Sequence, residues 1–157
     1  MTVAPIFARY LANKEIKYDV IAHEPTMTSS HTAQACHISG DRVVKGIVLR
    51  GDGVYTLAVL PASRRIRMTD LKARISPDVA LASEAEIDRL FRDCVLGAVP
   101  PVGPCYGLDV IVDDSIQEQP DVYLEGGDHV TLVHMSSAQF ARLTAGAPHG
   151  RFSVHMA

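Results

Sequence analysis

Apolar residues recur along the chain at two spacings, one helical and one alternating, and these spacings outline the secondary structure. Ile6, Phe7, Tyr10 and Leu11 fall on one face of a helix, which predicts an amphipathic helix over residues 4–13. Further helices are predicted where a residue that caps a helix N-terminus precedes an apolar run. Ser29 or Ser30 can cap a helix that runs to about His37. Ser83 caps a second helix and forms a capping box with Glu86, three residues later. Ser136 with Gln139 forms the capping box of a third helix, which ends at Gly146.

The strand-like segments are short, apolar and rich in β-branched residues. Residues 43–49 and 54–60 flank Gly51-Asp52-Gly53, so they predict an antiparallel hairpin. Because groups of strands alternate with single helices, the predicted class is α+β, with a mixed, mostly antiparallel sheet flanked by helices. The remaining predicted strands are residues 17–23, 108–113, 121–124 and 130–135, with a last edge strand over 151–155.

Length and composition indicate one globular domain spanning residues 1–157. Apolar residues make up 47% and charged residues 21% of the 157 residues, which excludes a disordered chain. No apolar run is long enough for a membrane span and the N-terminus does not resemble a secretory signal, so we expect a cytoplasmic protein without a membrane partner. The formal net charge of −3 argues against a protein that coats nucleic acid in bulk, and we expect no DNA partner.

The sequence gives no reason to expect a metal or a cofactor. The three cysteines, Cys36, Cys94 and Cys105, form no close pair, which argues against a disulfide framework and a cysteine-based zinc site. None of the seven histidines has a tight metal-ligand spacing. No glycine-rich phosphate loop follows a predicted strand, so a nucleotide cofactor is not expected either.

Lys45 is the first residue that the fold alone does not explain. It lies within a predicted strand, and strand alternation places it on the same face as Ile47 and Leu49. A lysine on an apolar face is costly to bury unless it has an anionic partner or reaches a cleft. The alternative is a lysine near the end of the strand whose charged end extends to solvent.

A second unexplained feature is the segment 97–104, which contains two glycines and three prolines. Such a segment cannot form a regular element, and its prolines stiffen the backbone. The N–H groups of Gly97, Ala98 and Val99 are then free to face a ligand, as in an anion or oxyanion site. The alternative is a stiff connection between a helix and a strand.

Two further features call for attention. His129 follows Gly126-Gly127-Asp128, a sequence that predicts an exposed turn, whereas the other histidines are interpreted as surface or hydrogen-bonded residues. A basic cluster could hold a phosphate backbone, or it could be a solvated charged face balanced by Asp70. Its five members are Arg64, Arg65, Arg67, Lys72 and Arg74.

Taken together, these segments resemble the YbaK family, also called the prolyl-tRNA-synthetase-associated editing domain. Residues 41–49, Asp-Arg-Val-Val-Lys-Gly-Ile-Val-Leu, resemble the family's strand with its functional lysine, and residues 94–103 resemble its GxxxP loop. His23-Glu24-Pro25, the hairpin ending in Pro61, and the segment 126–129 followed by an apolar strand also fit. Ala98 and Pro100 depart from the YbaK branch, which favours the less characterised branches of the family.

The resemblance implies deacylation of mischarged tRNA in trans, without metal or nucleotide. The expected substrate is tRNA for proline carrying alanine, serine or a similar small amino acid, and the expected partner is the acceptor end, with transient contact to a synthetase or elongation factor. Lys45, the N–H groups of Gly97, Ala98 and Val99, and His129 are the expected catalytic set. The expected lining of the amino-acid pocket is Met27, Thr28, His31, Val99, Pro100 and Pro101.

Two other functions remain compatible with the residues. A noncatalytic tRNA-binding module would use the same lysine and basic cluster. A generic hydrolase of small esters would need the loop and no basic surface.

Overall fold

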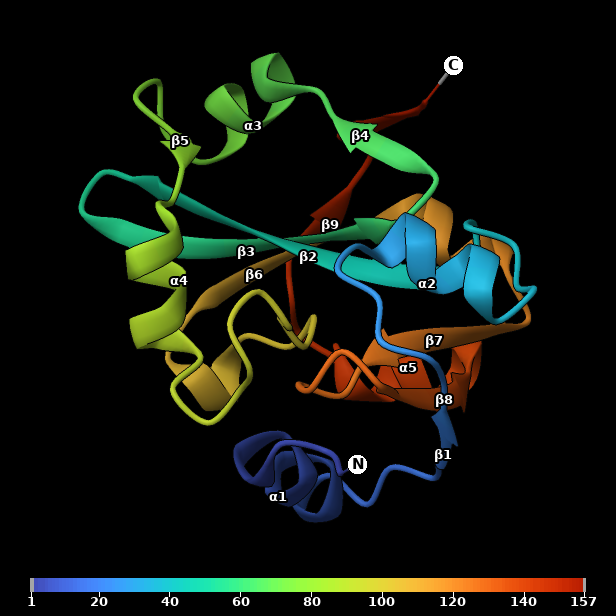
Figure 1. Ribbon diagram of the computed structural model, residues 1–157. Coiled ribbons are helices and arrows are strands. Elements are labelled where there is room, and N and C mark those ends of the chain that lie inside the picture. Colours follow the sequence, from blue (N-terminus) through green and yellow to red (C-terminus); the bar gives the residue numbers. More distant parts are fainter. Residues whose placement is uncertain (1, 157) are drawn as a thin grey trace.

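The computed structural model describes residues 2–156, so the two terminal residues of the predicted domain lie outside the described part of the chain. Figure 1 shows a central twisted sheet with helices on both sides. The strands of the main sheet are β1 (Asp19–Ala22), β2 (Val43–Gly51), β3 (Val54–Pro61), β5 (Ala80–Leu81), β6 (Asp109–Asp113), β7 (Asp121–Glu125), β8 (Thr131–Ser136) and β9 (His149–Gly150). The helices are α1 (Pro5–Asn13), α2 (Ser29–Ala35), α3 (Met68–Arg74), α4 (Glu84–Leu90) and α5 (Ser137–Leu143), with 3₁₀ turns η1 (Pro104–Tyr106) and η2 (Asp114–Glu118).

The sheet mixes both strand directions, as the sequence predicts. Its order is β1-β8-β7-β2-β3-β6-β9, and β5 pairs with β2 off this path. The pairs β2·β7, β3·β6 and β6·β9 are parallel, whereas β1·β8, β7·β8, β2·β3 and β2·β5 are antiparallel. The predicted class, a mixed and mostly antiparallel sheet flanked by helices, is therefore confirmed.

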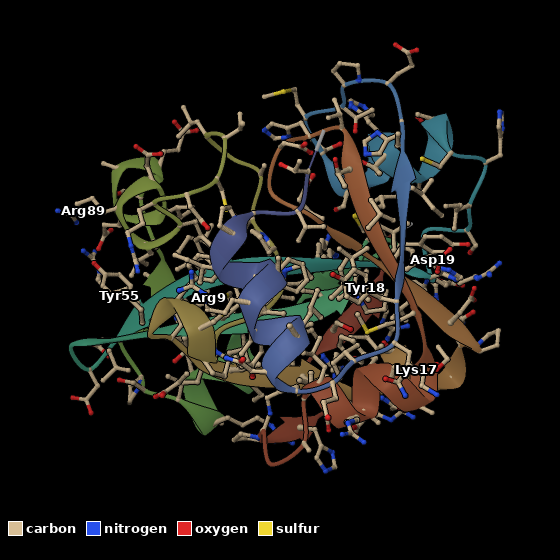
Figure 2. All side chains as sticks on the ribbon, turned by 90° about the horizontal axis from the view of Figure 1, so that it is seen from below. Arg9, Lys17, Tyr18, Asp19, Tyr55 and Arg89 are labelled. Atoms are coloured by element: carbon tan, nitrogen blue, oxygen red, sulfur yellow. The ribbon has the colours of Figure 1, made fainter. Side chains whose placement is uncertain are left out.

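Both faces of the central strand β3 are buried, because helices cover the sheet on both sides. Leu57 and Val59 point into a core that α1 and α5 complete, with Phe7 and Phe140 among its fully buried side chains. Ala58 and Leu60 alternate to the opposite core, where α3 contributes Leu71 and the C-terminal segment contributes Phe152. Figure 2 shows α1 lying across the first of these faces, seen from below.

Most predicted elements are present with small shifts at their ends. The predicted helix at 4–13 is α1, and the predicted strands at 17–23, 43–49, 54–60, 108–113, 121–124 and 130–135 are β1, β2, β3, β6, β7 and β8. The capping box of α4 is complete, because the Ser83 hydroxyl accepts from the Glu86 N–H at 3.2 Å and Glu86 Oε1 accepts from the Ser83 N–H at 2.9 Å. No helix in residues 2–156 is long and apolar enough to cross a membrane.

Two predicted helix caps are wrong. Thr28, not Ser29 or Ser30, caps α2, because its hydroxyl accepts from the His31 N–H at 3.1 Å. Gln139 does not complete a capping box with Ser136, since its side-chain oxygen accepts from the Lys17 N–H at 2.8 Å. The predicted last edge strand is present with shorter bounds, as β10 (Ser153–His155), which pairs with β4 (Arg64–Ile66) in a separate two-stranded ribbon.

One edge of β2 is paired only at its two ends. β7 pairs with Val43 and Val44, and β5 pairs with Leu49 and Arg50. The Ala82 N–H also donates to the Val48 carbonyl at 3.0 Å, which shows that the backbone groups of even-numbered residues in β2 face this edge. By the same alternation, the N–H and C=O of Gly46 face the gap between β7 and β5.

A network of charged and aromatic side chains holds together the strands on one side of this gap. Arg42 donates from Nε and Nη2 to the two carboxylate oxygens of Asp121, at 2.8 and 2.6 Å. The His134 ring contacts Asp121 through Nε2 at 2.7 Å and Asp19 through Nδ1 at 2.8 Å, and it stacks on Tyr123. The network therefore ties β1, β8 and β7 to the start of β2.

This network predicts a pH-dependent stability. Burial alone would lower the pKa of His134, but the hydrogen bonds to Asp121 and Asp19 outweigh burial and raise it. The stabilisation is therefore complete below the ordinary histidine pKa of about 6.5 and is lost as pH rises through the raised value. We expect His134→Gln to destabilise the protein more at pH 5.5 than at pH 8.5, by up to about 1 kcal/mol. Urea unfolding at both pH values measures the difference, with the exposed His31→Gln as control; equal losses at both pH values would contradict it.

Candidate functional site

A pocket of about 680 Å³ opens at the unpaired edge of β2, and we refer to it as the β2 pocket. Strand β2 forms one wall, and the segment 26–32 forms another. The loop that follows α4 and the turn between β7 and β8 complete it. The residues whose chemistry matters below are Met27, Thr28, Lys45, Gly46, Gly97, Val99, Glu125 and His129, and all of them line this pocket.

Lys45 is half-buried in the wall that β2 provides. Its ammonium group donates to the Ala62 carbonyl across a long distance of 3.4 Å, and no carboxylate of the described residues pairs with it. Burial lowers the pKa of Lys45 below its usual value. A buried cation with one weak protein partner retains donors for an anionic ligand.

The loop 97–101 presents two unused backbone donors to the pocket. Within residues 2–156, the N–H groups of Gly97 and Val99 donate to no protein acceptor, and both residues line the pocket. The Ala98 N–H, which the sequence predicts to be free, donates instead to the Val95 carbonyl at 2.9 Å. The expectation is therefore corrected from three free donors to two, because Ala98 closes a turn within the loop.

His129 orients one of these donors. Its Nε2 lies 2.7 Å from the Leu96 carbonyl oxygen, and since a carbonyl only accepts, Nε2 carries the proton. Across a planar trans peptide, the Leu96 C=O and the Gly97 N–H point in opposite directions. The His129 hydrogen bond thus fixes the Gly97 N–H to point away from the imidazole ring.

The turn that carries His129 is itself strongly held. His129 has a φ of +67°, a left-handed conformation that is uncommon for a residue with a Cβ. Glu125 Oε2 accepts from the N–H groups of Gly127, Asp128 and His129 at 2.8, 3.2 and 3.3 Å. These bonds stabilise the strained turn, so Glu125 positions His129 and, through it, the loop.

The structure brings together only part of the predicted amino-acid pocket. Met27 and Thr28 line the β2 pocket, although the Thr28 hydroxyl already accepts the capping hydrogen bond of α2. His31 is exposed and lies outside the lining. Pro100 and Pro101 are buried and do not line it, since the loop turns its prolines toward the sheet. Pro101 Cα lies so near Gly46 that a Cβ there would approach it within 3.3 Å.

The basic cluster lies outside the pocket, and most of it is engaged within the protein. Arg64 donates to the Ser153 hydroxyl and carbonyl at 2.8 and 2.9 Å, and Arg67 pairs with Asp70 at 2.7 Å. Arg74 reaches the His149 carbonyl at 3.4 Å. Only Arg65 and Lys72 are exposed without such a partner among the described residues.

Sequence reasoning missed Gly46, Glu125 and Met156 among the residues that line the pocket. Gly46 follows Lys45, and Glu125 precedes the predicted turn at residues 126–129. A glycine or a glutamate at these positions does not indicate a binding site unless the pairing of the strands is known. Met156 reaches the pocket because its N–H donates to the Ser63 carbonyl at 3.0 Å, which holds the end of the chain beside β4. No local sequence signal predicts this long-range contact.

The arrangement suits reactions in which negative charge develops on a carbonyl oxygen. Two N–H groups without protein acceptors can donate to such an oxygen, and an ammonium that lines the same pocket can hold a phosphate. Burial raises the pKa of the Cys94 and Cys105 thiols to about 12, which makes both unsuitable as nucleophiles at neutral pH. Within residues 2–156, no group of three or more His, Cys, Asp or Glu side chains is placed to hold a metal ion.

Solved structures share this fold over nearly the whole chain. A protein described only as hypothetical superposes with a TM-score of 0.83 at 22% identity, covering 95% of this chain and 99% of its own. A candidate trans-editing enzyme for prolyl tRNA synthetase superposes with a TM-score of 0.82 at 22% identity, covering 96% of both chains. At these identities the likeness shows a common fold.

Sequence comparison adds the family. A proline--tRNA ligase from Pseudothermotoga lettingae is 25% identical over 126 residues, which are 78% of this chain and only 22% of the ligase. This chain therefore spans about a fifth of the length of that relative. The family model of the aminoacyl-tRNA editing domain matches residues 23–143, which include the lysine strand, the loop and the His129 turn. On this match over most of its length, the chain belongs to the aminoacyl-tRNA editing domain family.

Proposed function

We propose that this protein acts as a free-standing editing factor in the cytoplasm and removes a small amino acid from mischarged tRNA for proline. The observation that carries the proposal is the β2 pocket, in which a half-buried ammonium and two unused N–H donors line one space. The pocket volume of about 680 Å³ exceeds what a small amino acid needs, which leaves room for the terminal nucleoside beside it.

In the proposed mechanism, the loop stabilises the transition state of ester hydrolysis. Attack on the ester carbonyl places negative charge on its oxygen, and the N–H groups of Gly97 and Val99 would receive that charge. Loss of one such donor typically costs about 3 kcal/mol of transition-state stabilisation. Because the ester of an aminoacyl-tRNA is already activated, a water molecule can act as the nucleophile, and a hydroxyl of the terminal ribose can assist the proton transfer to the leaving ribose oxygen.

Lys45 would hold the substrate from the other side of the pocket. An ammonium that has only one long protein hydrogen bond can bind the terminal phosphate or ribose and keep the ester at the loop. The weakly committed cations outside the pocket, Arg65 and Lys72, would add contacts to the acceptor stem. We therefore propose the acceptor end as the ligand, with any synthetase or elongation factor meeting the protein transiently.

A panel of mischarged tRNAs tests the proposed substrate. We expect hydrolysis of alanyl- or seryl-tRNA for proline and little hydrolysis of phenylalanyl-tRNA, since the amino acid would share the pocket with the terminal nucleoside. Rates are measured by loss of labelled amino acid at two salt concentrations, because phosphate contacts weaken steeply with salt. Binding without hydrolysis would support a noncatalytic tRNA module, and salt-independent hydrolysis would support a generic esterase.

Substitution of Lys45 tests the role of the ammonium. We expect Lys45→Ala to lower kcat/KM at least tenfold while the protein stays folded, because a charged hydrogen bond to the substrate is lost. Lys17→Ala serves as the matched control, since Lys17, labelled in Figure 2, is exposed and does not line the pocket. Parental activity of Lys45→Ala on the best tRNA of the panel would show that Lys45 is merely a surface lysine.

Two substitutions in the loop separate a backbone role from a side-chain role. Gly97 has a φ of +80°, so Gly97→Ala should displace the donor that His129 orients and reduce the rate a hundredfold or more. Val99→Ala retains its N–H and should cost no more than about tenfold through looser packing.

The control for Gly97→Ala is a glycine of equal backbone strain elsewhere. Gly107 has a φ of +77°, open space around it and no place in the β2 pocket. Gly107→Ala should therefore cost about 1 kcal/mol of stability and leave the rate nearly unchanged. Steady-state rates and urea unfolding are measured for all three variants. A loss of rate in Val99→Ala as large as that in Gly97→Ala would refute the oxyanion interpretation.

A further inference from the structure

Two opposite charges line the β2 pocket without pairing with each other. In the parallel pair β2·β7, Val44 lies opposite Leu124, so the next residues, Lys45 and Glu125, follow at the same level and on the same face of the sheet. Both line the pocket, yet no ion pair joins them within 4.0 Å. Neighbouring opposite charges that stay apart leave each available to a ligand that carries both signs of charge.

The carboxylate of Glu125 is anchored through only one of its oxygens. Oε2 accepts all three N–H groups of the turn that carries His129. Oε1 receives no hydrogen bond from any residue of the described part of the chain. The anchored oxygen holds the side chain in one orientation, so the second oxygen is a fixed acceptor that a donor can reach without reorganising the protein.

The open edge of β2 adds a second acceptor. The alternation of β2 directs the Gly46 carbonyl toward the gap between β7 and β5, and Gly46 also lines the pocket. Glycine at this position has no side chain to cover its backbone. Among its unpaired polar groups the pocket thus has two acceptors, Glu125 Oε1 and the Gly46 carbonyl, and on the loop two donors, the N–H groups of Gly97 and Val99.

We infer that Glu125 Oε1 and the Gly46 carbonyl form a subsite for the α-ammonium group of the aminoacyl ester. The inference rests on the proposed deacylase function and adds the part of the substrate that this side of the pocket recognises. A primary ammonium offers three donors to the two acceptors, while the ester carbonyl accepts from the loop. An acylated amine has one donor and no charge, so formylated, acetylated or peptidyl esters would leave the carboxylate poorly compensated.

One other carboxylate lines the pocket, and its setting differs. Glu84 begins α4, and its residue is exposed to solvent. Ion pairs of exposed carboxylates contribute little to binding, and no hydrogen bond of the described residues orients this side chain. Glu125 is half-buried and oriented, which favours it as the ammonium ligand.

The test compares two esters of one tRNA that differ only in the α-substituent. The best substrate of the tRNA panel is converted with nitrous acid to the corresponding α-hydroxyacyl-tRNA, and kcat/KM for both esters is measured for wild type and Glu125→Gln. Glutamine retains an oxygen that can accept the three N–H groups of the turn. We expect the ratio of aminoacyl to hydroxyacyl hydrolysis to fall about tenfold or more in Glu125→Gln, because charge pairing with the ammonium is lost.

Control variants separate recognition from support of the turn. If Glu125 only supports His129, both esters slow equally and the ratio is unchanged, which would overturn the inference. Glu118→Gln should leave the ratio at the wild-type value, since Glu118 is exposed, pairs with Arg151 and lies outside the pocket. A fall of the ratio in Glu84→Gln instead of Glu125→Gln would also overturn it.

A measurement on wild type alone keeps the inference testable if Glu125→Gln does not fold. Rates on N-acetylaminoacyl-tRNA and aminoacyl-tRNA are each divided by the uncatalysed rate of the same ester, and we expect the free amine to be preferred about tenfold or more. Equal normalised rates would refute the ammonium subsite and leave the deacylase function intact. Failure of wild type to hydrolyse any ester of the panel would refute the proposed function itself.

Discussion

The incomplete pairing of β2 is the constraint on which the rest of the site depends. β7 and β5 cover only the two ends of one edge, and between them the backbone N–H and C=O of Gly46 face no neighbouring strand, although β2 pairs with β3 along its other edge. A buried strand normally satisfies these groups within the sheet, so an exposed interval inside a fold is a place for ligand or water. The charged network of Arg42, Asp121 and His134 ties the start of β7 to the start of β2, and the gap begins where this short parallel pairing ends.

A short relay of hydrogen bonds then sets the geometry at this gap. Glu125 holds the turn that follows β7, the turn holds His129 in a left-handed conformation, and His129 holds the Leu96 carbonyl. Planarity of the peptide transfers this constraint to the Gly97 N–H. Donors oriented before the substrate arrives need no reorganisation when charge develops, which is the main source of electrostatic stabilisation in such sites.

Glycine has two separate roles in this arrangement. Gly97 permits the positive φ that aims the loop, and its would-be Cβ meets only the His129 ring at 3.7 Å. Gly46 permits close approach, because a Cβ there would lie 2.9 Å from Leu57 and 3.3 Å from Pro101. The proline-rich loop can therefore pack closely on β2, the strand that carries Lys45. This close packing brings the loop N–H groups and the Lys45 ammonium into the same pocket.

The sequence by itself determined the elements, the strand that carries Lys45 and the segment that forms the loop, because local periodicity, β-branched runs and proline content act over a few residues. It also indicated the turn with His129. It could not indicate that the Ala98 N–H donates to a carbonyl within its own loop, or that Arg64 and Arg67 bind Ser153 and Asp70. It also could not indicate that Glu125 and Lys45 line one pocket without forming an ion pair. These outcomes depend on which strands lie side by side: Glu125 and Lys45 are eighty residues apart along the chain, and only the parallel register of β2 and β7 places them together.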